Sequence, residues 1–89
     1  MHIEHLTSQQ QFRATVEGRS CVLDYHLRAG VLVITHTEVA RALRGRGIGA
    51  ALMREVLDHA QRHGLKVHPA CSYASAYMND HPQTAALRV

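Results

Sequence analysis

Aromatic residues and cysteines are scarce in this sequence. It contains no tryptophan, one phenylalanine and three tyrosines among 89 residues, so aliphatic side chains must fill most of its core. The two cysteines, Cys21 and Cys71, are too few for a disulfide framework, which favours a reducing, cytoplasmic location. Scarce aromatics also argue against a surface on which nucleic-acid bases stack.

Long apolar runs are missing as well. No apolar stretch approaches the roughly 18 residues of a membrane span, and no basic-then-apolar leader opens the chain, so we expect neither membrane insertion nor export. The formal charge of +3 and the pI near 9.3 suit an anionic ligand. Basic residues form no run outside residues 41–46, so nucleic acid is not an expected partner. The length predicts one domain spanning residues 1–89.

Alternating glycines organise the middle of the chain. They follow a β-branched run at residues 31–39 and precede an amphipathic segment that ends at Gly64. Unpaired N–H groups and the dipole at a helix start favour an anion there, and glycine lets phosphate oxygens approach the backbone. The pattern predicts a site for a phosphate-bearing ligand, with a merely flexible turn as the alternative. Its residues are Arg44, Gly45, Arg46, Gly47, Ile48 and Gly49.

Spacing excludes two nucleotide-binding motifs. A Walker loop needs Lys-Ser or Lys-Thr after its last glycine, whereas Ala50-Ala51 follows Gly49. A dinucleotide fingerprint needs an acidic residue about 20 positions further on, and residues 65–69 contain none. What remains is R-x-x-G-x-G, fixed at Arg44, Gly47 and Gly49.

This hexad resembles the pyrophosphate loop of the GNAT N-acetyltransferase superfamily, (Gln/Arg)-x-x-G-x-(Gly/Ala). The likeness covers roughly residues 12 to 85, and residues 36–39, 69–73 and 81–82 resemble the short "minimal" members that lack most N-terminal acceptor-binding helices. It implies acetyl-coenzyme A as co-substrate, held in a gap between splayed strands. Backbone groups near Val39 would hold the pantetheine, and residues Arg44, Gly45, Arg46, Gly47, Ile48 and Gly49 would hold the pyrophosphate.

The order of elements predicts an α/β (α+β) fold. Strands at 12–17, 20–27 and 31–39, joined by short turns, must form an antiparallel meander, while residues 1–11 are either a frayed lead-in or an edge strand. After the helix that ends at Gly64, a strand at 65–68 should run parallel to the third strand, and a second helix should cover 71–79. Leu87 and Val89, apolar residues near the end of the sequence, should anchor the tail to the core.

The first helix carries one apolar stripe, which should pack on the sheet. Its members are Leu52, Met53, Val56, Leu57 and Ala60, whereas Arg54, Glu55, Asp58, His59, Gln61 and Arg62 should face water. His59 and His63 have the spacing of a helical ligand pair, but no further ligand lies near them in sequence. We therefore expect no structural metal.

Five residues are candidates for catalysis. Cys71 should lie near a helix start, which favours a thiolate, so it is an acyl-accepting nucleophile, a polar neighbour of the thioester, or a small core residue. Tyr73 and Tyr77 share a helical face, and either could protonate the departing thiolate or simply pack in the core. His36 and Glu38 share a strand face, as a base for the acceptor amine or as a polar pair.

The resemblance implies an acetyl-coenzyme A-dependent N-acetyltransferase in which a primary amine attacks the thioester directly. The acceptor would be a small molecule or a peptide, and the protein a monomer or weak dimer. The leading alternative is a non-catalytic acyl-coenzyme A-binding or sensing module, because little chain remains to hold an acceptor. An RNA-associated basic protein is a third, weaker hypothesis.

Overall fold

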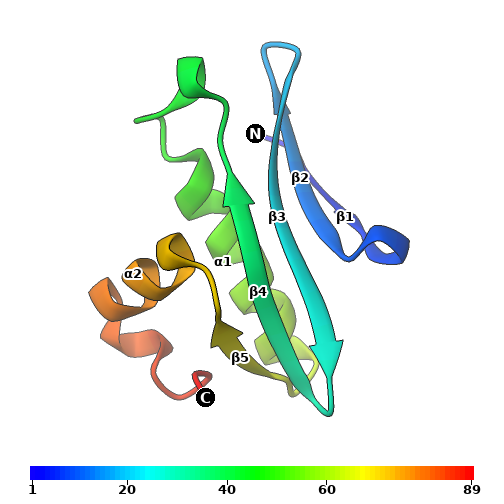
Figure 1. Cartoon of the computed structure of the whole chain (residues 1–89), viewed down its shortest axis with the longest axis vertical. Helices are drawn as coiled ribbons and strands as arrows, with labels where there is room; N and C mark the ends of the chain where they lie inside the picture. Colours follow the sequence, from blue (N-terminus) through cyan, green and yellow to red (C-terminus); the bar gives the residue numbers. More distant parts are fainter.

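Five strands form one sheet in chain order, from β1 at one edge to β5 at the other (Figure 1). The computed structural model describes all residues, 1–89. The strands are β1 (Ile3–Leu6), β2 (Gln11–Val16), β3 (Arg19–Arg28), β4 (Val31–Glu38) and β5 (Lys66–Pro69). The helices are α1 (Ile48–Arg62) and α2 (Ser72–Asp80), with 3-10 turns at Thr7–Gln9, Arg41–Leu43 and Pro82–Thr84.

The topology confirms the predicted α+β arrangement. Strands β1 to β4 are antiparallel neighbours, and β5 pairs with β4 in parallel after the α1 crossover. Of the two alternatives for residues 1–11, the edge strand is correct, because Ile3–Leu6 pairs with β2. The other boundaries differ from the prediction by one or two residues.

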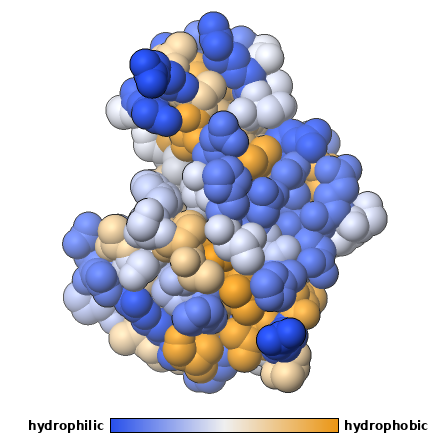
Figure 2. All heavy atoms as spheres, viewed as in Figure 1, coloured by the Kyte–Doolittle hydropathy of each residue, from blue (hydrophilic) through white to orange (hydrophobic).

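The core lies between one face of the sheet and the two helices. The apolar stripe predicted for α1 is confirmed, since Leu52, Met53, Val56 and Ala60 are 0% exposed. Sheet residues of the same layer include Leu23, Leu32 and Ile34, also 0% exposed. The opposite sheet face has no covering helix and carries mainly hydrophilic side chains over β2 and β3 (Figure 2).

His59 is the exception on α1. We expected it to face water, but it is half-buried, whereas His63 one turn further on is exposed. The ring of His59 lies edge-on to His5 of β1, with centroids 4.6 Å apart, and also contacts Phe12. Because β1 extends the sheet past the apolar stripe, it covers one more position of the helix than the hydropathy pattern indicated.

The last residues of the chain run along the outer edge of β5. The Val67 N–H donates to the Leu87 carbonyl at 2.8 Å, and the Val89 N–H donates to the Val67 carbonyl at 2.9 Å. Leu87 packs partly on the core, as predicted. Val89 is 58% exposed, so its backbone rather than its side chain holds this end of the tail, contrary to prediction.

Candidate active site

β4 and β5 separate halfway along β4. Their pairing ends at Ile34 and Pro69, where the N–H groups of Ala70 and Cys71 both donate to the Ile34 carbonyl, at 2.9 and 3.1 Å. Beyond this point β4 continues to Glu38 and pairs only with β3. Residues 35–38 therefore have one free edge, which we call the free half of β4. Unpaired strand edges present N–H and C=O groups to a ligand.

A β-bulge lies where the free half begins. The register with β3 passes from Tyr25 opposite Ile34 to Asp24 opposite His36, so Thr35 is the extra residue. The inserted residue shifts the alternation of side chains by one position. Thr37 therefore stands opposite buried Leu23 on the helix side, while His36 and Glu38 face the uncovered side of the sheet.

A cavity of about 700 Å³ opens beside the free half of β4. It lies between that strand, the loop after it and the first turn of α1, and Figure 2 shows the surface hollowed between this loop and α2. Its lining includes most of the predicted site residues. The lining residues are His36, Thr37, Glu38, Val39, Leu43, Arg44, Gly45, Gly47, Ile48, Gly49, Ala50 and Tyr73.

The glycine loop has the backbone of an anion site. Gly45 and Gly47 have φ values of 85° and 79°, which side chains rarely adopt, and no atom lies within 4 Å of where their Cβ would be. Gly47 is the N-cap residue of α1, and no side chain caps this helix end. The Ala51 N–H donates to the Gly47 carbonyl and is the first N–H of the helix with a backbone acceptor. The preceding N–H groups have no acceptor within the helix and add to its dipole.

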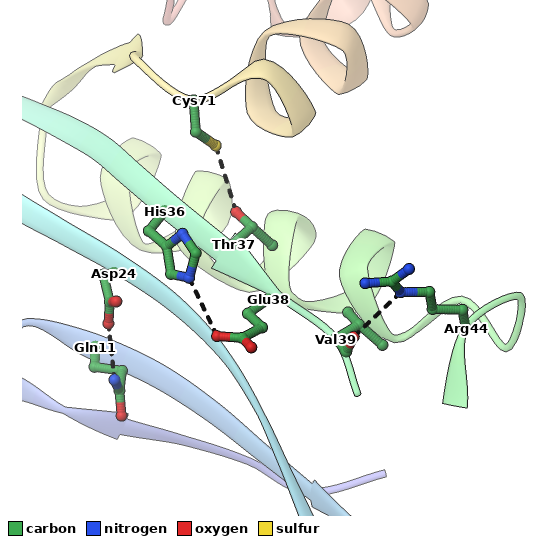
Figure 3. Close-up of polar contacts among 8 residues, drawn as sticks. All are labelled: Gln11, Asp24, His36, Thr37, Glu38, Val39, Arg44 and Cys71. Carbon is green, nitrogen blue, oxygen red and sulfur yellow. Dashed lines mark hydrogen bonds and ion pairs between the residues drawn. The ribbon is translucent and has the colours of Figure 1, made fainter. Parts of the chain in front are cut away.

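The two loop arginines are placed differently. Arg44 lines the cavity, and its Nε donates to the Val39 carbonyl at 3.4 Å (Figure 3). Arg46 is absent from the lining, and its guanidinium pairs with Glu17 at the tip of the β2–β3 hairpin. Glu17 is distant in sequence, and no local pattern pointed to this pair.

His36 and Glu38 contact each other at the rim. His36 Nε2 lies 3.3 Å from Glu38 Oε1, and the two side chains are 55% and 67% exposed (Figure 3). Both residues line the cavity. Their shared face, predicted from spacing, is confirmed, and they form a polar pair at the rim.

Cys71 joins α2 to the free half of β4. It is the N-cap of α2, where its Sγ accepts from the Ala74 N–H at 3.4 Å and lies 3.6 Å from Thr37 Oγ1 (Figure 3). The thiol is partly buried and packs against the core. Its predicted position at a helix start is confirmed, but it is not among the residues that line the cavity.

The two tyrosines of α2 have different surroundings. Tyr73 lines the cavity, whereas Tyr77 stacks on His81 with ring centroids 3.9 Å apart. Burial raises the pKa of Tyr73, neighbouring Tyr77 raises it further, and Arg54 acts in the opposite direction. Tyr73 is therefore a neutral hydroxyl donor at physiological pH.

The chain contains no group of three His, Cys, Asp or Glu side chains arranged to hold a metal ion. The His5, His59 and His63 rings contact one another near the far end of α1, His59 lying edge-on to His5 and tilted against His63. Neither helix has the length and apolarity needed to cross a bilayer.

The fold is that of GCN5-like proteins. The solution structure of a GCN5-like protein from Staphylococcus aureus superposes with a TM-score of 0.81, covering 99% of this chain and 87% of that one at 23% identity.

Sequence comparison identifies the family of the chain. Residues 11–87 match the GCN5-related N-acetyl-transferase family. Protein NATD1 of Homo sapiens is 32% identical over 85 residues, covering 92% of this chain and 75% of that protein. The Gallus gallus NATD1 is equally similar and is covered to 77%. The chain therefore belongs to the GCN5-related N-acetyltransferase family.

Proposed function

We propose that this protein transfers an acetyl group from acetyl-coenzyme A to a primary amine by direct attack. The observation that carries the proposal is one cavity that joins a free strand edge to a helix start whose first N–H groups have no acceptor within the helix. A ligand with an amide-containing arm and a pyrophosphate needs both features. The proposal treats residues 1–89 as one catalytic domain acting in the cytoplasm.

Binding would use mainly backbone groups. The pyrophosphate would accept from the N–H groups at the start of α1 and pair with Arg44, because these donors converge on the cavity. The pantetheine amides would hydrogen-bond to the free half of β4 and Val39, as an added strand does. Arg46 would have to leave Glu17 to contribute.

The chemistry requires a neutral amine. An acceptor that arrives as an ammonium would first pass one proton to Glu38 or His36, directly or through water, because both lie at the rim on the uncovered side. The amine nitrogen then forms a bond to the acetyl carbon and gives up a second proton, while the carbon–sulfur bond breaks. The departing thiolate takes a proton from Tyr73 or from water, and the proton released by the nitrogen replaces it. Backbone N–H groups on the free half of β4, just beyond the strand separation, would stabilise the oxyanion.

A covalent route through Cys71 is the alternative mechanism. The thiol sits beside Thr37 but is already engaged as a helix cap and lies outside the lining, which favours direct transfer. The non-catalytic binding module remains the rival function, because the same cavity serves binding alone.

Native mass spectrometry with acetyl-coenzyme A tests these proposals. The wild-type protein should retain the cofactor without an acetyl adduct, and addition of an amine panel should consume acetyl-coenzyme A. Stable binding with no turnover on any amine would support the rival module. An adduct that disappears in Cys71→Ala and passes its acetyl group to an amine would establish the covalent route.

The site itself is tested by Gly47→Val. Its side chain would enter the space meant for phosphate, so coenzyme A affinity should fall about tenfold or more. Gly64→Val is the matched control, because Gly64 also has a positive φ of 66° and open space around it but lies at the other end of α1. It should show a similar loss of stability and unchanged affinity. Equal affinity of Gly47→Val and wild type would refute the site.

A further inference from the structure

The phenol of Tyr73 fills the space beside Gly49 that a larger residue would occupy. A Cβ added to Gly49 would lie 2.7 Å from the Tyr73 hydroxyl oxygen, 2.9 Å from Cζ and 3.3 Å from Cε2. Contacts below about 3.0 Å are not tolerated between such atoms. A side chain at position 49 and the observed position of the Tyr73 ring therefore exclude each other.

Gly49 differs in this from the other loop glycines. Gly45 and Gly47 need glycine because their φ is positive, whereas Gly49 has ordinary helical backbone and is buried. The loop motif also accepts alanine at the position of Gly49. In this chain the Cβ of an alanine would force the outer end of the Tyr73 ring to move, so it is packing that favours glycine here.

The contact brings two helix starts together at the cavity. Gly49 is the second residue of α1, and Tyr73 is the second residue of α2. The N–H of Gly49 is one of those without an acceptor inside its helix. The Tyr73 hydroxyl thus lies beside the backbone donors of the anion site, and it is itself a donor at neutral pH.

We propose that Tyr73 is a cofactor-binding residue whose hydroxyl donates to the phosphate-bearing end of the ligand, and that Gly49 is the seat that holds its ring there. This inference rests on the coenzyme A site proposed above. It assigns Tyr73 to binding rather than to protonation of the departing thiolate, because the hydroxyl rests against the glycine loop.

Calorimetric titration of a small variant set tests the hydroxyl. Tyr73→Phe keeps the ring and should melt close to wild type, yet bind coenzyme A about fivefold to tenfold more weakly, the cost of one donor to a charged acceptor. Its affinity for pantetheine, which lacks every phosphate, should be unchanged. Tyr77→Phe is the matched control, because Tyr77 lies on the same helix outside the cavity, and it should bind both ligands normally.

A double-mutant cycle tests the seat. Gly49→Ala should weaken coenzyme A binding about tenfold when Tyr73 is present, because the ring must move. In a Tyr73→Ala background the same substitution should cost less than about twofold, since the space is then free. Melting temperatures of all four proteins would show that each is folded.

Three outcomes would overturn the inference. If Tyr73→Phe bound coenzyme A as tightly as wild type, the hydroxyl would not contact the ligand. If Gly49→Ala had an equal effect in both backgrounds, Gly49 would not act by holding the Tyr73 ring. In each case the wild-type protein still binds coenzyme A, so the proposed function survives. Failure of the wild-type protein to bind coenzyme A would overturn both proposals together.

Discussion

The two halves of β4 belong to one strand but differ in pairing and burial. From Val31 to Ile34 the strand has a partner on each side, and Leu32 and Ile34 are completely buried. From Thr35 to Glu38 it has a partner on one side only, and its residues are exposed or partly exposed. One strand is therefore fully paired and buried in one half and has a free edge in the other, with a single bulge between them; under the proposed function that free edge would hold the ligand.

The largest expected contrast comes from truncating one residue in each half. Ile34→Ala should lower the free energy of unfolding by about 2–5 kcal/mol, since it leaves a cavity in the core. Thr37→Ala, in the free half, should cost less than about 1 kcal/mol, because only the contact with Cys71 is lost. Urea unfolding of both variants measures the difference. Similar losses would show that the free half is as important for stability as the paired half.

Acid should destabilise the packing of His5 and His59, which a hydrogen bond from His5 to Tyr25 links to the paired half of β4. Tyr25, opposite Ile34, bonds to His5 Nε2 at 2.6 Å, and His5 contacts His59. Burial lowers the pKa of His5, with His63 adding to the effect. Burial likewise lowers the pKa of His59, followed by His5, His63 and Arg62, while Asp58 opposes them. Both histidines are therefore harder to protonate in the folded than in the unfolded chain.

The sign of the pH effect follows from that difference. Below about pH 6.5 the unfolded chain binds more protons than the folded one, so stability is full above this pH and falls as the pH drops toward the lowered folded-state pKa values. The melting temperature should fall by a few degrees between about pH 7.5 and 5.5. His59→Gln should reduce this dependence, and His26→Gln, on the uncovered face, should not. A flat profile for the wild type would contradict the prediction.

The smallest effect is expected at the Arg46–Glu17 pair beside the free half. Glu17→Gln should release Arg46 for the ligand phosphates and tighten coenzyme A binding by about twofold at low salt, because exposed pairs are weak. Asp58→Asn is the matched control: it changes the charge equally and breaks the pair with Arg62 on α1. Equal tightening in both variants would mean that only net charge matters.

The sequence predicted what local patterns determine. Alternation and turns gave the meander, and the stripe from Leu52 to Ala60 gave the packed face of α1. The glycines between a strand and a helix predicted the loop that lines the cavity. The chain order, with a helix between them, required β4 and β5 to be parallel. Each of these follows from residues close together in the chain.

Contacts between distant residues could not be predicted in this way. The bulge at Thr35 decides which face His36 and Glu38 occupy, and no residue type marks it. Glu17 holds Arg46 from a hairpin tip, and Tyr73 rests on Gly49 from another helix. His59 is covered only because β1 pairs where it does. Such pairs depend on the assembled sheet rather than on spacing.

The tail beside β5 also affects how the molecule behaves at high concentration. An exposed edge strand is a template on which other chains can add and aggregate. Residues 87–89 occupy the outer edge of β5 with hydrogen bonds to both the N–H and the carbonyl of Val67. The opposite edge of the sheet, β1, is only four residues long. The tail thus occupies the backbone groups of β5 on which a strand of a second molecule would otherwise pair.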